Sequence, residues 1–218
     1  MTRIYLYDHC PFCVRASLVA GYKHVAFERV VLLNDDEKTC FDLIGAKMVP
    51  ILEHDGALIG ESLDICKRLD EIGDEKQIIL PASGLDQQVA DQLSQVGHAQ
   101  WALSFPRVIR IGLPEFATEG AQAYFRSKKE KMLEMSFDDA LANTGAHKNA
   151  VEQVLADLPK LPLPSERENR LSWDDVIIFP RLRGLTLVKG LEFPESIQTY
   201  LKEISSLTGV DLYFDRAI

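Results

Sequence analysis

Apolar residues follow two patterns along the chain, and the first 73 residues mix strand-like and helix-like spacing. Short alternating or β-branched runs predict strands at Arg3–Asp8 and Phe27–Leu33 and a hairpin at Val49–Gly60. Segments with apolar residues at helical spacing predict three helices, at Pro11–Tyr22, Asn34–Gly45 and Glu61–Gly73. The order strand, helix, strand, helix, strand, strand, helix implies a mixed sheet covered by helices.

From residue 85 onward the spacing is helical throughout. Ser172 and Asp175 form a capping-box pattern ahead of one apolar run, which indicates the start of a helix. Glycine, charged residues and Pro81 cluster between the two parts of the chain, as in a linker. We therefore predict an α/β domain at 1–73, a linker at 74–84 and an all-α helical domain at 85–218.

Composition and charge narrow the classes of function. The chain has 218 residues, 46% of them hydrophobic, which is enough for a packed core. Its formal net charge of −9 disfavours nucleic acid and anionic membranes as partners, although a local pocket of donors can still bind a small anion. No stretch approaches 18 apolar residues and the first ten residues lack a signal-peptide pattern, so we expect a cytoplasmic protein without a transmembrane helix.

The segment YDHCPFC, Tyr7–Cys13, places two of the four cysteines at the expected junction of strand and helix. Pro11 suits the first helical turn, so Cys10 is expected at a helix N-terminus, where free N–H groups and the helix dipole favour a thiolate. Cysteines in such settings have pKa values of about 3.5 to 7.5. Cys13 follows one turn later on the same face, within reach of a disulfide. The pattern predicts an exposed nucleophile, Cys10, and a shielded resolving thiol, Cys13.

A zinc site is the competing interpretation of this cysteine pair. Structural zinc sites use four ligands. Cys40 and Cys66 are isolated cysteines, and the chain has no second Cys-x-x-Cys motif. Disulfides do not persist in the cytosol, so a close pair there is either redox-active or metal-binding. We predict a redox site and no metal.

Two further pairs of residues each allow two interpretations. Val49-Pro50 is compatible with an ordinary strand start, since proline is tolerated there, or with a cis peptide bond, which is the rarer form. Ser62, after Glu61, is compatible with a simple N-cap, or with a helix N-terminus that binds a carboxylate of a small peptide. The residues alone leave both pairs open.

The chain resembles the glutathione-dependent glutaredoxins, specifically the bacterial glutaredoxin 2 family, which is built like a glutathione transferase. The resemblance runs essentially from end to end. The first motif is shared with several thioredoxin-like families, whereas the combination with the helical half is far more specific. Five segments carry the resemblance: YDHCPFC, VLLNDDE, VPIL, ESLDI and FPRLRGLTLVKG.

The resemblance implies a thioredoxin-like domain followed by an all-helical domain. It implies that Cys10 is the catalytic nucleophile and that Cys13 is the resolving thiol. Val49 would bond the cysteine part of glutathione through its main chain, and Pro50 would be cis. Phe12 stands where many glutaredoxins carry tyrosine, which removes a hydroxyl and keeps the ring. The implied glutathione-binding residues are Pro11, Phe12, Val49, Pro50, Glu61 and Ser62.

The implied activity is the reduction of mixed disulfides, including those on proteins, with glutathione as co-substrate. The resemblance also implies that the protein works as a monomer. A glutathione transferase or a dehydroascorbate reductase with the same two-domain architecture is the first alternative. A transferase activates only the thiolate of glutathione, so it would have no role for Cys13. A non-enzymatic, membrane-associating protein of the same plan is the second, which the net charge disfavours.

Several other residues allow two interpretations. His9 either favours the Cys10 thiolate as an imidazolium or is an exposed turn residue. Arg107 and Arg110 either reach a cleft between the domains or lie on a solvated helix face, and the second is favoured. Trp101 is expected in a core or at the domain interface. The charged run RSKKEKM, 126–132, is expected on a solvated face.

Overall fold

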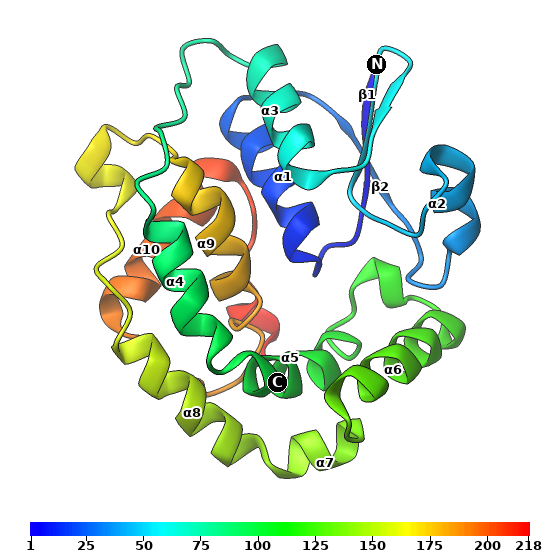
Figure 1. The fold of residues 1–218 in the computed structure, drawn as a ribbon, viewed down its shortest axis with the longest axis vertical. Helices are drawn as coiled ribbons and strands as arrows, with labels where there is room; N and C mark the ends of the chain where they lie inside the picture. The colour runs from blue at the N-terminus through cyan, green and yellow to red at the C-terminus, as the bar shows by residue number, and fades with distance from the viewer.

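The computed structural model describes all 218 residues, and its first half is a four-stranded sheet with helices on both faces (Figure 1). The strands lie in the order β2-β1-β3-β4, with β1 parallel to β2 and antiparallel to β3. Figure 1 shows α1 and α3 on one side of the sheet and α2 on the other. The strands are β1 (Thr2–Leu6), β2 (Glu28–Val31), β3 (Ile51–His54) and β4 (Ala57–Ile59).

Local sequence signals set the ends of these elements. The side chain of Asp36 accepts a hydrogen bond from Thr39 N at 2.9 Å and caps α2, and Gly45 ends the helix with a φ of 71°. Asp55 and Gly56 both have positive φ angles, as the predicted hairpin turn requires. The three helices are α1 (Pro11–Tyr22), α2 (Glu37–Ile44) and α3 (Ser62–Ile72).

The second half is entirely helical, as predicted. The predicted capping box is present, because Ser172 accepts from Asp175 N while the Asp175 carboxylate accepts from Ser172 N. Its α-helices are α4 (Leu85–Ser94), α5 (Gly97–Val108), α6 (Glu119–Leu133), α7 (Phe137–Ala142), α8 (Thr144–Ala156), α9 (Trp173–Arg183) and α10 (Glu195–Thr208). Three short 3₁₀ helices complete it: η1 (Pro114–Phe116), η2 (Pro164–Arg167) and η3 (Phe214–Arg216).

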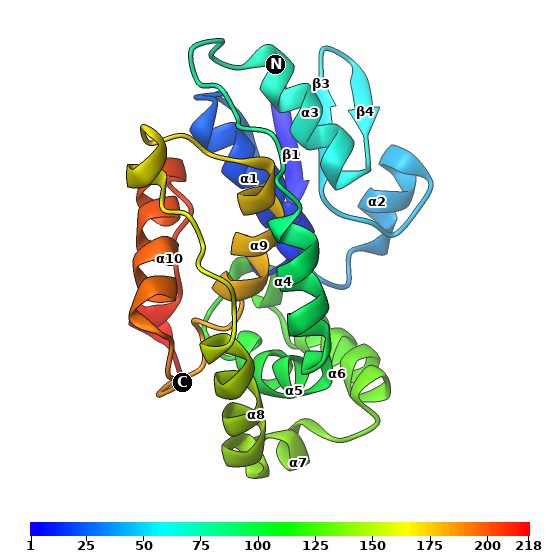
Figure 2. The same cartoon turned by 60° about the vertical axis from the view of Figure 1, so that its left-hand side comes forward.

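One apolar core joins the two halves. It runs from Ile4 on β1 through α1 to Ile204 on α10, and α1 packs against both α9 and α10. Figure 2 shows α1 lying between the sheet and these two helices. Between α3 and α4 the chain crosses the helical half, where Leu80 N donates to Leu171 O at 2.8 Å. The domain limits 1–73, 74–84 and 85–218 remain a prediction. No helix is both long and apolar enough to span a bilayer.

Candidate active site

Cys10 lies at the N-cap of α1, the position that its spacing from Pro11 predicts. Its backbone is extended, with φ −71° and ψ 120°, and Pro11 occupies the first helical position. The first turn of a helix leaves main-chain N–H groups without helical partners. The main-chain N–H groups of Phe12 and Cys13 act to lower the pKa of Cys10, and Cys10 is only half-buried. The local fold therefore presents one sulfur at the positive end of a helix.

The two thiols have opposite electrostatic settings. A hydrogen bond from the Cys13 side chain is the largest cause that lowers the pKa of Cys10, to about 6, and the charge of His9 and the main-chain N–H groups act in the same direction against burial. Burial, followed by the hydrogen bond and charge of Cys10, raises the pKa of Cys13. Cys13 is 1% exposed, and its sulfur accepts from Tyr7 N at 3.4 Å. At neutral pH this pairing favours a Cys10 thiolate beside a neutral Cys13 thiol.

The Val49-Pro50 peptide bond is cis. Val49 and Cys10 both pack against a small apolar cluster that includes Tyr7 and Ile51. Neither the N–H nor the C=O of Val49 has a hydrogen-bond partner within the protein. Free main-chain groups at a residue that shares this cluster with Cys10 are suited to pairing with the backbone of a peptide ligand.

Glu61 and Ser62 open α3 in a way that differs from the simple capping interpretation. Glu61 is the N-cap residue and makes no capping bond with its side chain, whereas Ser62 is the first helical residue and is 6% exposed. The hydroxyl of Ser62 accepts from Arg15 Nη1 at 3.3 Å, which links α3 to α1. The interpretation of Ser62 as an N-cap is wrong, because the chain enters the helix one residue earlier. The exposed Glu61 carboxylate has no partner in the protein.

The two residues that precede Cys10 are held by the helical half. Arg183 on α9 donates to the main-chain oxygen of Asp8 and to its carboxylate, each at 2.8 Å. Burial acts to raise the pKa of Asp8, but the charge of Arg183 and the hydrogen bonds from Tyr213 and Arg183 outweigh it and lower that pKa. No local pattern indicates this contact, because 175 positions separate the two partners.

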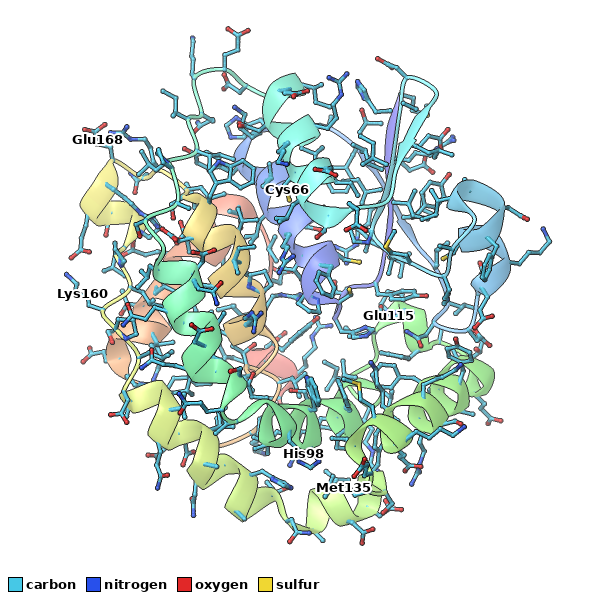
Figure 3. The ribbon with its side chains drawn as sticks, in the orientation of Figure 1. Cys66, His98, Glu115, Met135, Lys160 and Glu168 are labelled. Atoms are coloured by element: carbon cyan, nitrogen blue, oxygen red, sulfur yellow. The ribbon has the colours of Figure 1, made fainter.

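His9 is anchored by Glu115 in η1. Oε1 of Glu115 accepts from His9 N at 3.0 Å and lies 2.7 Å from His9 Nδ1. Glu115 is fully buried and its Oε2 has no partner, and Figure 3 shows it beside the start of α1. The ring of His9 is stacked against Tyr7 and touches Phe116. His9 is therefore not an exposed turn residue.

A cleft of about 730 Å³ opens between the two halves at Cys10. Four of the predicted site residues line it, namely Cys10, Pro11, Phe12 and Val49. Cys13, Pro50, Glu61 and Ser62 do not line it, although Arg15 connects Ser62 to its wall. The opposite wall comes from α5 and α6, with Trp101, Phe105, Tyr124, Phe125, Lys128, Lys129 and Met132.

Neither expectation for Arg107 is correct. Arg107 lies neither in the cleft nor on a solvated face, because it is 6% exposed and donates to the main-chain oxygens of Leu103 and Ile218. The run at 126–132 is accessible to solvent as expected, since none of its residues is buried, and Lys128, Lys129 and Met132 also line the cleft. Trp101 also lines the cleft, and its exposed fraction is 39%.

Cys40 and Cys66 are fully buried and free. The structure contains no group of three or more His, Cys, Asp or Glu side chains arranged to hold a metal ion.

Comparison with known proteins agrees with this architecture. Residues 88–217 match the model of the glutaredoxin 2 C-terminal domain, and residues 4–77 match that of the glutathione S-transferase N-terminal domain. Glutaredoxin 2 of Escherichia coli K12 is 34% identical over 99% of this chain and 100% of its own length.

Solved structures show the same relationship. The crystal structure of glutaredoxin 2 from Salmonella typhimurium in complex with glutathione matches with a TM-score of 0.87 and 34% identity, over 100% of this chain and 99% of that one. Human glutathione S-transferase T1-1 matches with a TM-score of 0.57 over 99% of this chain and 87% of its own, at 15% identity, which shows the shared fold alone.

The fold defines a class of protein, in which a thioredoxin-like domain is followed by a helical domain in the arrangement of glutathione transferases. Within that class, the full-length match and the matching C-terminal domain are decisive: the chain belongs to the glutaredoxin 2 family. It is a glutaredoxin, a glutathione-dependent oxidoreductase, and the predicted fold class is confirmed.

Proposed function

We propose that the protein reduces mixed disulfides between glutathione and other thiols, including protein thiols, through Cys10. The observation that carries the proposal is the half-buried Cys10 sulfur at the start of α1, whose pKa is lowered to about 6 and which faces the cleft. A thiolate is the attacking species in thiol–disulfide exchange, so this sulfur is reactive at neutral pH.

The exchange takes place in two displacements. The Cys10 thiolate attacks the glutathione sulfur of the mixed disulfide, the sulfur–sulfur bond breaks, and the other thiol leaves as a thiolate that takes up a proton. Cys10 then carries glutathione. The thiolate of a second glutathione attacks that adduct, which releases oxidised glutathione and restores Cys10. In the alternative route Cys13 loses its proton and attacks Cys10, which releases glutathione and forms the Cys10–Cys13 disulfide, and two glutathione molecules then reduce it.

Glutathione binds along the sheet side of the cleft in this proposal. The free main-chain groups of Val49 pair with its cysteine residue, while the carboxylate of Glu61 and the N-terminus of α3 at Ser62 hold the γ-glutamyl end. Pro11, Phe12 and Pro50 shape the surface around the sulfur. The glutathione complex of the Salmonella relative supports glutathione as the ligand.

The proposed setting is a monomer in the cytoplasm. Glutaredoxin potentials of about −200 to −230 mV allow the cytosolic glutathione pool to keep such a site reduced. Gel filtration and cell fractionation test these two points.

Substitution of each cysteine tests the assignment in a glutathione-coupled assay with a mixed disulfide of glutathione and mercaptoethanol. We expect Cys10→Ser to lose at least about a hundredfold in kcat/KM, because the nucleophile is gone. We expect Cys13→Ser to retain part of the activity through the second glutathione. Cys66→Ala, which removes a thiol outside the cleft, is the control.

Retained activity in Cys10→Ser would rule the assignment out. Conjugation of a model electrophile to glutathione at a rate far above disulfide exchange would instead favour a transferase.

A further inference from the structure

The cleft has the opposite charge to the rest of the molecule. The chain carries 33 acidic against 24 basic residues, yet no aspartate or glutamate lines the cleft. Besides His9, four cations line it: Arg15, Lys128, Lys129 and Arg181. None of these four takes part in an ion pair, whereas Arg126 on the same helix as the two lysines pairs with Glu130 and Asp138. A cleft of this kind concentrates the field of its unpaired cations on an incoming anion.

Two of these cations belong to an aromatic surface on the helical half, which we call the cationic wall and define as Trp101, Phe105, Tyr124, Lys128 and Lys129. The rings of Trp101 and Phe105 are stacked, with centroids 6.1 Å apart. Lys129 Nζ lies 4.8 Å from the centre of the Phe105 ring, and Lys128 Nζ lies 5.3 Å from that of Tyr124. The wall thus joins flat apolar area to positive charge.

Lys129 lines the same cleft as the reactive Cys10. It is half-buried, and its ammonium group has only Met132 Sδ as a hydrogen-bond acceptor, at 3.8 Å. Burial lowers the pKa of Lys129, and the charge of Cys10, which lines the same cleft, partly offsets that effect. A partly desolvated cation without a counter-ion gains more from an arriving carboxylate than a fully solvated one does.

We propose that the cationic wall binds an acidic segment of the polypeptide whose glutathionylated cysteine is being reduced, and that the enzyme thereby selects acidic protein substrates. This inference rests on the proposed function. In a mixed disulfide the two substituents leave the sulfur–sulfur bond in different directions. With glutathione held at Val49 and the start of α3, the polypeptide faces α5 and α6. Carboxylates of that segment pair with Lys128 and Lys129, and an apolar side chain covers Trp101 and Phe105.

Three peptides that differ only in the residues around one glutathionylated cysteine test this selection. The flanking residues are glutamate, glutamine or lysine, and each peptide carries one phenylalanine, so the glutathione part is constant. We expect kcat/KM to be at least about tenfold higher for the acidic than for the basic peptide at low salt, and the ratio to shrink at high salt because the charges are screened.

The decisive comparison uses two double variants with the same change in net charge. Lys128→Gln/Lys129→Gln is expected to reduce the acidic-to-basic ratio to about twofold or less. Lys131→Gln/Lys202→Gln removes two exposed lysines outside the cleft and is expected to keep the wild-type ratio. Equal kcat/KM for the three wild-type peptides, or equal loss of the ratio in both double variants, would overturn the proposal.

Binding separates this inference from the proposed function. Dissociation constants of the same peptides with Cys10→Ser protein, measured by calorimetry, need no turnover. The acidic peptide is expected to bind about tenfold more tightly than the basic one, and equal affinities would contradict selection by the wall. Failure of the wild-type protein to reduce the mercaptoethanol mixed disulfide counts against the proposed function instead.

Discussion

At the scale of single residues, three consecutive positions differ in what they do. Asp8 and His9 are fixed by charged groups of the helical half, and Cys10, directly after them, is left free to react. The Cys13 thiol and the main-chain N–H groups of the first turn of α1 lower the pKa of this sulfur. Because these donors are already in place before substrate arrives, the thiolate is stabilised without rearrangement of the protein.

The hydrogen bond from Cys13 leads to a prediction about the thiolate. In the wild type the Cys10 pKa is about 6, against an ordinary value of 9.0, and Cys13 is the largest cause that lowers it. Cys13→Ala removes the donor, so the pKa of Cys10 is expected to rise, while Cys13→Ser keeps a hydroxyl donor and is expected to raise it less. The pH dependence of alkylation by iodoacetamide measures both midpoints. Identical midpoints in the wild type and Cys13→Ala would contradict this account.

At the scale of elements, α1 connects the chemistry to the rest of the fold. Its first residues present the cysteines, and its end passes very close to the end of α10. A Cβ atom added at Gly21 would lie 1.9 Å from the main-chain oxygen of Thr208, far inside a normal contact. Glycine is required here because it allows the two helices to approach, since the backbone oxygen cannot move aside as a side chain can.

Gly21→Ala is therefore expected to destabilise the fold by about 2 kcal/mol or more, as in other overpacked cores. Gly97→Ala is the matched control, because a Cβ atom at Gly97, the first residue of α5, meets nothing within 4 Å. The control is expected to be neutral or slightly stabilising. Urea unfolding of the two variants measures the difference, and equal stabilities would show that α1 and α10 can separate without cost.

At the scale of the whole molecule, the two halves are joined by packing and by charge. A continuous apolar core crosses the junction, and the contact between Asp8 and Arg183 adds a buried ionic connection. Arg183 is 3% exposed and also donates to Asp211 O at 2.6 Å. An ionic group this deeply placed is destabilising when it loses its partner, so the junction depends on the charge of Asp8.

That dependence predicts how stability varies with pH. The pKa of Asp8 in the folded protein lies below its ordinary value of 3.8, so the unfolded chain takes up a proton first as the pH falls. The contribution of Asp8 is fully present above about pH 4 to 5 and is lost as the pH falls further. We expect Asp8→Asn to be less stable than the wild type at pH 7 and the difference to shrink at pH 3.

Urea unfolding at several pH values measures this difference. Asp64→Asn, on the exposed side of α3, is the control and is expected to change stability at pH 7 by less than about 0.5 kcal/mol. A difference between wild type and Asp8→Asn that stays constant from pH 7 to pH 3 would contradict the assignment.

The strand and helix order, the turn at Asp55-Gly56 and the caps at Asp36 and Ser172 were predictable because each depends on residues a few positions apart. The strand predicted at Phe27–Leu33 is shorter in the structure, since pairing with β1 ends at Val31. The environment of Arg107 was not predictable, because a helical arginine has the same local pattern whether it is buried or solvated.

The sequence by itself determined the chemistry of the first helical turn. Cys10, Pro11 and Cys13 place a thiolate at a helix start because a proline there and a spacing of one turn act locally. Only the tertiary structure decided which groups surround that thiolate. Glu115, Arg183 and Lys129 come from far along the chain, and their contacts with the site follow from how α1 packs against the helical half, which no local pattern encodes.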